Sequence, residues 1–238
     1  MSAAAVPAPR REPAPDRPLR MIIEGINGVG KTTTARALAA ALGERCLLLA
    51  ELTDQPGDTL PGRVISALAA QDDVCLRTGH PVVETLALLA LKIREIERLA
   101  AYPTTREVVI EDRGVDTVAV YQAAILCAHV PEADPAHVAR HVLSSVSRWL
   151  PPPDATILLT GDREVCMRRF ADRIGRTLAP QDLRVIEQAD ALYTGLAAAE
   201  PHRYSVIDTA GRSAEAVADA VGALVQDLVK QREADHAA

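Results

Sequence analysis

Short apolar runs alternate with longer amphipathic segments along most of the chain. The apolar runs predict β-strands at about 20–24, 46–50, 107–111, 155–160 and 204–208. The segments between them have helical periodicity and predict helices at about 31–42, 60–71, 82–101, 115–129, 135–149, 163–173, 181–199 and 213–232. Parallel strands need a crossover between them, usually a helix. We therefore expect an α/β fold of three layers, α/β/α, with a five-stranded parallel sheet flanked by helices.

Two of the predicted strands show no alternation of apolar and polar positions. Val108–Val109–Ile110 and Thr156–Ile157–Leu158–Leu159 are continuous runs, which is typical of strands that are buried on both faces. In open parallel sheets, ligands bind beyond the carboxyl ends of the strands. The residues that follow each strand are therefore the first candidates for chemistry.

The first predicted strand leads into EGINGVGKTTT, residues 24–34. Gly25, Gly30, Lys31 and Thr32 fit the P-loop pattern G-x-x-x-x-G-K-[ST]. In that pattern backbone N–H groups surround a phosphate, the lysine reaches the β- and γ-phosphates, and the hydroxyl ligates Mg²⁺. The residues that we expect to hold a nucleoside triphosphate are Asn27, Gly28, Val29, Gly30, Lys31, Thr32 and Thr33. Lys31 is also a candidate catalytic residue, and Thr32 a metal ligand.

A second candidate segment, Glu111–Asp112–Arg113–Gly114, follows the third predicted strand. A carboxylate that closes an apolar strand of a P-loop protein commonly supplies a further Mg²⁺ contact, and an adjacent arginine can clamp a transferred phosphoryl group. We therefore expect Asp112 to be a metal ligand with a catalytic role, and Arg113 to be catalytic.

Composition narrows the class of protein. The chain has 238 residues, enough for one domain, and its first 18 residues are rich in Pro, Ala and Arg, which predicts a flexible tail at 1–18 and a folded domain at 19–238. A net charge of −6 argues against a nucleic-acid partner. The four cysteines lack C-x-x-C spacing, so we expect buried free thiols in a reducing cytoplasm. We see neither a signal peptide nor an apolar run of about 18 residues, and we expect no membrane partner.

The two chemical segments together resemble the thymidylate kinase family. Sequences of that family carry an EG-x-x-G-x-GKTT loop and a later DRY-x-x-S-x-x-AYQ segment, and this chain has EGINGVGKTT and EDRGVDTVAVYQA. Asp112, Arg113, Tyr121 and Gln122 occupy the D, R, Y and Q positions. The similarity continues through PPDATILLTGDREVCMRRF and YSVIDTAG, the second of which matches the family's terminal strand and adenine-side loop, and it covers about residues 20–230.

The resemblance implies a P-loop kinase domain with ATP and Mg²⁺ as cofactors, a nucleotide-type small molecule as acceptor, and a homodimer. It assigns residues to an arginine-bearing lid and to the acceptor site: Arg169, Arg173 and Arg176, and Arg94, Tyr121 and Gln122, respectively. Of the lid arginines, we expect Arg173 to be catalytic and Arg169 and Arg176 to contact the nucleotide.

Departures from the family pattern gather on the acceptor side. Where the family has T-R-E-P-G-G-T this chain has TDQPGDT, so Asp54 replaces an arginine. We align the family's LLFAADR with LLALKIR, which leaves Ala90 in place of a phenylalanine that stacks on the base and keeps Arg94. Loss of the ring removes stacking of about 1–3 kcal/mol. Gly114 replaces a tyrosine, and Asn27 replaces an acidic residue.

These departures leave the acceptor open. A phosphate acceptor needs only positioning and charge neutralisation, whereas a hydroxyl acceptor is helped by a general base. Related deoxynucleoside kinases carry that base in an E-P motif after the second strand, where this chain has Gln55–Pro56. Asp54 is our candidate catalytic replacement, with Glu51 as an alternative. A protein that binds ATP without catalysis is the remaining alternative.

Overall fold

The computed structural model describes residues 17–69, 73–101, 106–130 and 132–237. Its centre is one sheet of five strands in the order β2-β3-β1-β4-β5, all paired in parallel. The strands are β1 (Leu19–Glu24), β2 (Cys46–Leu49), β3 (Val108–Asp112), β4 (Ala155–Thr160) and β5 (Tyr204–Asp208). The predicted five-stranded parallel sheet is confirmed.

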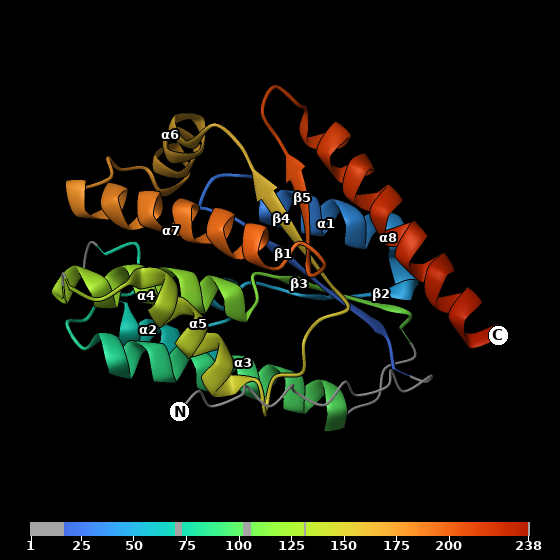
Figure 1. The fold of residues 1–238 in the computed structure, drawn as a ribbon, viewed down its shortest axis with the longest axis horizontal. Coiled ribbons are helices and arrows are strands. Elements are labelled where there is room, and N and C mark those ends of the chain that lie inside the picture. The colour runs from blue at the N-terminus through green and yellow to red at the C-terminus, as the bar shows by residue number, and fades with distance from the viewer. Residues whose placement is uncertain (1–16, 70–72, 102–105, 131, 238) are drawn as a thin grey trace, which may run out of the picture.

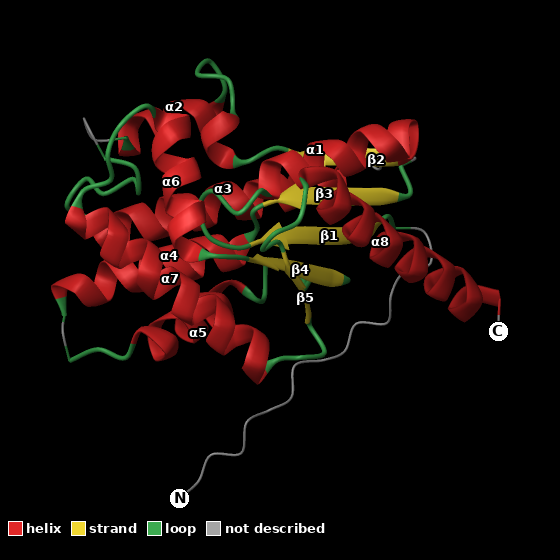
Figure 2. Cartoon of the chain, turned by 90° about the horizontal axis from the view of Figure 1, so that it is seen from above, coloured by secondary structure: helices red, strands yellow, loops and turns green. Residues whose placement is uncertain are grey.

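Eight α-helices and two short 3-10 helices connect and cover the strands of the described chain (Figure 1). They are α1 (Lys31–Leu42), η1 (Gly43–Arg45), η2 (Leu52–Asp54), α2 (Leu60–Leu68), α3 (Pro81–Ala101), α4 (Val115–His129), α5 (Pro135–Val146), α6 (Arg163–Ile174), α7 (Pro180–Ala199) and α8 (Ala214–Ala237). Helices α1 and α8 pack together against the sheet, whereas α3, α4, α5 and α7 pack against one another on its other side. Figure 2 shows most of these other helices grouped toward one end of the strands. This is the predicted three-layer architecture.

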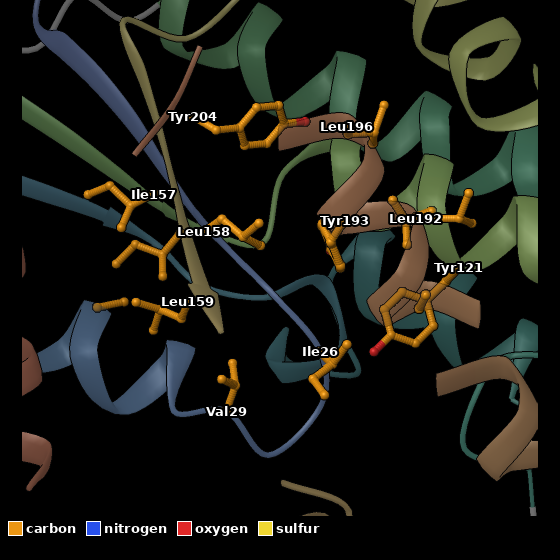
Figure 3. Close-up of a cluster of buried hydrophobic side chains, with 14 of the residues drawn as sticks. Ile26, Val29, Tyr121, Ile157, Leu158, Leu159, Leu192, Tyr193, Leu196 and Tyr204 are labelled. Atoms are coloured by element: carbon orange, nitrogen blue, oxygen red, sulfur yellow. The ribbon is translucent and has the colours of Figure 1, made fainter. Parts of the chain in front are cut away.

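Both central strands are wholly buried. Every residue of β1 and β3 has little exposed surface, as the continuous apolar runs predict. The cluster in Figure 3 joins Leu158 and Leu159 of β4 to Ile26 and Val29, the two apolar residues of the phosphate loop. Ile26 and Val29 are each 2% exposed. The hydrophobic core therefore anchors the loop that carries the P-loop pattern.

The main differences from the predicted elements lie at their ends. The helix expected at 135–149 ends at Val146, before the Pro151–Pro153 run, which cannot supply helical N–H donors. The helix expected at 60–71 ends at Leu68, and 70–72 lie outside the described residues. β3 extends to Asp112, one residue further than predicted. The 3-10 helices η1 and η2 have no counterpart in the prediction.

The predicted tail at 1–18 lies outside the described residues except for its last two positions. Arg17 makes two hydrogen bonds to the carboxylate of Asp154, at 2.5 and 2.7 Å. Of the four cysteines, Cys75 and Cys166 are buried, and the other two are partly exposed. Among the described residues, no helix is long and apolar enough to cross a membrane.

Candidate active site

The phosphate loop connects β1 to α1 at the carboxyl edge of the sheet. Gly28 and Gly30 have φ angles of +80° and +109°, in the region that favours glycine. A Cβ at Gly28 would collide with the backbone carbonyl of Cys166 in α6, whereas the space beside Gly30 is open. Gly30 begins α1 without a side-chain cap, and the first turn carries no acidic residue. The N–H groups of this turn are therefore placed to bind an anion.

A cavity of about 310 Å³, the donor cavity, lies over this loop. Its lining is Gly28, Val29, Gly30, Lys31, Thr32, Thr33, Thr34, Arg113, Arg169, Arg173, Thr209, Arg212, Ala214 and Val217. All of its charged lining residues in the described chain are cations, which suits a polyphosphate. Of the predicted lid arginines, Arg169 and Arg173 line the cavity and Arg176 does not.

Two donor-side residues come from the loop after β5. Thr209 and Arg212 line the donor cavity, and neither was singled out by sequence reasoning. The segment YSVIDTAG, which was expected near the adenine, brings this loop to the cavity. A basic residue just beyond that segment was the available signal for Arg212.

The side chain of Lys31 is buried against the backbone of the phosphate loop. Its Nζ donates hydrogen bonds to the carbonyl oxygens of Gly25 and Ile26, both at 2.7 Å. Burial lowers the pKa of Lys31, the positive charge of Arg113 lowers it further, and the nearby carboxylates, Glu51 first, oppose this shift. A bound phosphate would supply the missing negative charge.

Thr32 and Asp112, the residues that were predicted to hold a metal ion, lie next to each other. Asp112 is 2% exposed, and its buried Oδ1 has no hydrogen-bond partner among the described residues. Burial raises the pKa of Asp112, while a hydrogen bond with Thr32 and the charge of Arg113 oppose that shift. A hydroxyl and a carboxylate are oxygen ligands of the kind that Mg²⁺ prefers. The pair therefore fits Mg²⁺, which when bound would neutralise charge on the phosphates.

Arg113 has an unusual backbone conformation. Its φ is +67°, a left-handed value that costs a non-glycine residue about 1–2 kcal/mol. Three hydrogen bonds hold it there. The Arg113 N–H donates to Ile23 O at 3.2 Å, Lys92 Nζ donates to Arg113 O at 2.6 Å, and the Gly114 N–H donates to Glu24 Oε1 at 2.8 Å. Strain that the surroundings enforce in this way is a mark of functional positions.

The side chain of Arg113 lies between two cavities and lines both of them. Its Nη2 donates to Asn27 Oδ1 at 2.7 Å, and its Nε lies 2.8 Å from Glu51 Oε1. Asn27 was expected to bind the nucleotide, but its residue lines only the second cavity. Both groups of Asn27 already have partners there, because its Oδ1 accepts from Arg113 and its backbone N–H donates to the Tyr121 hydroxyl.

The second cavity, the acceptor cavity, has a volume of about 110 Å³. Its lining is Asn27, Glu51, Leu52, Thr53, Ile65, Val74, Cys75, Leu76, Leu88, Lys92, Arg113, Gly114, Thr117, Val118, Tyr121 and Gln122. Tyr121 points its hydroxyl toward the phosphate loop (Figure 3), where it accepts a hydrogen bond from the Asn27 N–H at 3.1 Å. Gln122 Oε1 accepts one from the Thr85 hydroxyl at 3.0 Å. Two of the three predicted acceptor residues, Tyr121 and Gln122, therefore line one cavity.

A sequence model described as thymidylate kinase matches residues 23–221. A thymidylate kinase of Cereibacter sphaeroides is 30% identical over 221 residues, which cover 88% of this chain and 95% of that protein. One of Bifidobacterium longum subsp. infantis is 32% identical, covering 89% of this chain and 88% of that protein. The solved thymidylate kinase of Candida albicans has the same fold, with a TM-score of 0.64 at 16% identity over 89% of this chain and 92% of that one.

The chain belongs to the thymidylate kinase family. It is a P-loop kinase. On the donor side, residues 28–33, Arg169 and Arg173 line the cavity as expected, whereas Asn27 and Arg176 do not. The acceptor half differs from the expectations at two places.

The first difference is in α3, where the residues that line the cavity lie two positions before the expected ones. Leu88 and Lys92 line the acceptor cavity, whereas Arg94 lines neither cavity and Ala90 is exposed. Two residues correspond to a rotation of about 200° around a helix. A side chain two positions away from a cavity residue therefore points away from the cavity. Leu88 and Lys92 therefore face the cavity where Ala90 and Arg94 were expected to face it. The sequence did contain a signal for Lys92. It lies at helical spacing from Thr85 and Leu88, and all three residues are buried on one side of the helix.

The second difference is the acidic residue after β2. Asp54, the predicted catalytic residue, lines neither cavity, and its half-exposed carboxylate lies 3.1 Å from Arg36 Nη2. Glu51 lines the acceptor cavity instead. Glu51 precedes η2 and Asp54 is its last residue, so the turn of η2 places the two on different sides and only Glu51 of the pair lines the cavity.

Gly114, which stands where thymidylate kinases have a tyrosine, is packed against β1. A Cβ added there would lie 2.6 Å from Ile22 Cδ1 and 3.2 Å from Glu24 Oε1. Glu24 is fully buried and also accepts hydrogen bonds from Thr117 and Tyr193. Burial raises the pKa of Glu24 to about 7, and the negative charge of Asp116 adds to the shift. Glu24 thus ties the residue after Arg113 to α4 and α7.

Proposed function

We propose that the protein transfers the γ-phosphoryl group of ATP to a nucleotide-type small molecule that enters the acceptor cavity. The observation that carries this proposal is the position of Arg113, which lines the donor cavity and the acceptor cavity. A guanidinium between two substrates can contact the group that passes from one to the other. Phosphoryl transfer is catalysed mainly by such positioning and charge stabilisation.

On this proposal, the loop residues 28–33 bind the triphosphate through their N–H groups and hydroxyls, and Lys31 neutralises the β- and γ-phosphates. Arg169 and Arg212 contact the donor, and Arg173 reaches the transferred phosphoryl group. ATP and Mg²⁺ are the proposed cofactors, with Thr32 and Asp112 as the metal ligands.

The acceptor residues are Tyr121 and Gln122, joined by Leu88 and Lys92 in the places first proposed for Ala90 and Arg94. Because the curated relatives are named thymidylate kinases, dTMP is the first acceptor to test. Leu88 supplies apolar surface but no aromatic ring, so base stacking of about 1–3 kcal/mol is absent at this position.

ADP release in the presence of ATP and Mg²⁺ tests the proposal. We expect at least one member of a panel of nucleosides and nucleoside monophosphates to raise the rate about tenfold or more above that with ATP alone. ATP binding without acceptor-dependent turnover would favour the alternative of a non-catalytic ATP-binding protein.

We also propose that the chain forms a homodimer, as the family resemblance implies. Val82, Val83 and Leu86 lie on one exposed face of α3 and are 60%, 60% and 61% exposed. The opposite face of the same helix lines the acceptor cavity through Leu88 and Lys92. Burial of an apolar helix face against a second copy is favourable, and sedimentation analysis of the purified protein measures the mass that this predicts.

A further inference from the structure

The carboxylate of Glu51 lines the acceptor cavity. Binding of a negatively charged nucleotide there does not explain why this cavity carries a negative charge. Glu51 follows β2 and precedes η2. Its side chain is 15% exposed and lies 2.8 Å from Arg113 Nε. The residue thus faces the acceptor cavity beside the arginine that borders both cavities.

The charges around the acceptor cavity are already balanced within the protein. Lys92 Nζ lies 2.9 Å from Glu111 Oε1 and 3.0 Å from Glu95 Oε2. Arg113 is paired with Glu51. Among the described lining residues, the remaining members are uncharged. By contrast, the donor cavity is lined by cations alone in the described chain.

This balance distinguishes between two classes of acceptor. A dianionic phosphate in the acceptor cavity would approach the carboxylate of Glu51 and would meet cations that already have partners. Repulsion between like charges is strong where water is largely excluded. A neutral hydroxyl meets no such repulsion, and it can donate a hydrogen bond to the carboxylate.

We infer that the phosphorylated group is a hydroxyl of a nucleoside-type molecule and that Glu51 is the catalytic base that receives its proton. This inference rests on the ATP-dependent transfer of the proposed function, and it replaces the nucleotide-type acceptor named there with a nucleoside-type one. The acceptor oxygen forms a bond to the γ-phosphorus of ATP while the bond from that phosphorus to the β–γ bridging oxygen breaks, and ADP leaves. The hydroxyl proton passes to Glu51 and then to water, so the products are a phosphate monoester, ADP and one proton.

The surroundings of Glu51 suit this role. Burial raises the pKa of Glu51, but the positive charges of Arg113 and Lys31 outweigh it, and the net effect is a lowered pKa. The carboxylate is therefore ionised at neutral pH and can accept a hydrogen bond from the acceptor hydroxyl, whose proton it receives only as the bond to phosphorus forms. When Glu51 takes the proton, Arg113 loses its internal counter-charge, and its guanidinium can interact more strongly with the transferred phosphoryl group.

Paired substrates test the inference without knowledge of the natural acceptor. The rate of ADP release is measured for each common deoxynucleoside and for its 5′-monophosphate, which differ only in the phosphate. We expect the best nucleoside to have a kcat/KM about tenfold or more above that of its monophosphate. Preference for the monophosphate would overturn the inference and leave the kinase proposal intact. Turnover of no member of the panel would count against the kinase proposal itself.

Variants of Glu51 test the base directly. We expect Glu51→Gln to lower kcat for the best nucleoside by about 10²-fold, and Glu51→Asp to restore part of it. ATP binding by calorimetry should change little, because Glu51 does not line the donor cavity. Glu107→Gln is the matched control, since Glu107 is 52% exposed and pairs with Arg45 at the opposite end of β3.

Asp54→Asn is the competing variant, because Asp54 lies three positions further along and outside the cavity. A large loss of kcat in Asp54→Asn with normal turnover in Glu51→Gln would assign the base to Asp54 and overturn the inference. Unchanged nucleoside turnover in both variants would show that no carboxylate of this loop acts as a base, which also overturns it.

Discussion

The donor region and the acceptor region of this protein are assembled in different ways. Half of the donor lining is the continuous segment Gly28–Thr34, whose conformation depends on glycine φ angles and on the start of α1. The acceptor lining is drawn from separate segments between Asn27 and Gln122, and its shape depends on how their side chains pack. The comparison teaches that a site made of backbone is visible in a short motif, whereas a site made of packed side chains is not.

The two regions also differ in charge. In the described chain, the charged residues that line the donor cavity are all cations. A bound polyanion would balance their charge. The acceptor cavity contains Glu51, and its cations are paired internally. Arg113 lines both cavities, and its guanidinium lies beside Glu51.

The largest effect is expected from Lys31→Ala, which removes the cation of the donor region. We expect phosphoryl transfer to fall by about 10³-fold or more, because charge on the transferred group loses a preorganised partner. Lys230 is exposed on α8, so Lys230→Ala is the matched control. ADP release and thermal unfolding are measured for both variants. A folded Lys31→Ala protein with near-normal turnover would contradict the ATP-kinase assignment.

Lys92→Met sharpens the comparison on the acceptor side. This change leaves the buried Glu111 and the partly buried Glu95 without their cation, and removing one partner of a buried pair costs about 3–5 kcal/mol. Urea unfolding measures the loss. Arg94→Met is the matched control, because Arg94 lines neither cavity, and it should cost less than about 1 kcal/mol. The reverse order would show that the ion pairs of Lys92 contribute little to stability.

Arg113→Ala should separate the two regions. We expect kcat to fall by about 10²–10³-fold, the scale of a lost transition-state contact. The ATP dissociation constant should change only a few-fold, since Lys31 and the loop N–H groups remain. Calorimetric titration with ATP and steady-state kinetics measure the two quantities. If ATP binding weakened as much as kcat, Arg113 would belong to the donor side alone.

The smallest effect concerns pH and Glu24, which connects Gly114 to α7. Burial, with help from Asp116, raises the pKa of Glu24 from 4.5 to about 7. Because folding favours the protonated form, its stabilising contribution is present below pH 4.5 and is lost as the pH rises through about 7. Glu24→Gln should therefore lose less stability between pH 5 and pH 8 than the parent, by about 1 kcal/mol or more. Urea unfolding at both values measures it, and equal losses would show that Glu24 does not titrate in this range.

Much of the architecture was predictable because it follows from local patterns. The runs around Val109 and Ile157 are buried strands, and the P-loop pattern correctly located Lys31 and Thr32 at the donor cavity. The position of Asp112 at the carboxyl end of a buried strand, beside Thr32, was predictable as well, and its role as a metal ligand stays a prediction. The homodimer and the cytoplasmic location stay predictions.

The acceptor side could be predicted only in part. Tyr121 and Gln122 were correctly expected at one site, because they lie in a segment that matches the family residue by residue. Arg94 and Asp54 were not found at the cavities, since a shift of two positions in α3 and one short turn in η2 decide which side chains face inward.

The amino-acid sequence by itself determined the parallel sheet, the phosphate loop and the pair Thr32 and Asp112. These depend on backbone conformation and on residues adjacent in the chain or at strand ends. Only the tertiary structure decided that Arg113 adopts a left-handed conformation between two cavities and that Glu51 is its counter-charge. The physical reason is that such contacts form across long sequence separations, where packing and burial select partners that no local pattern specifies.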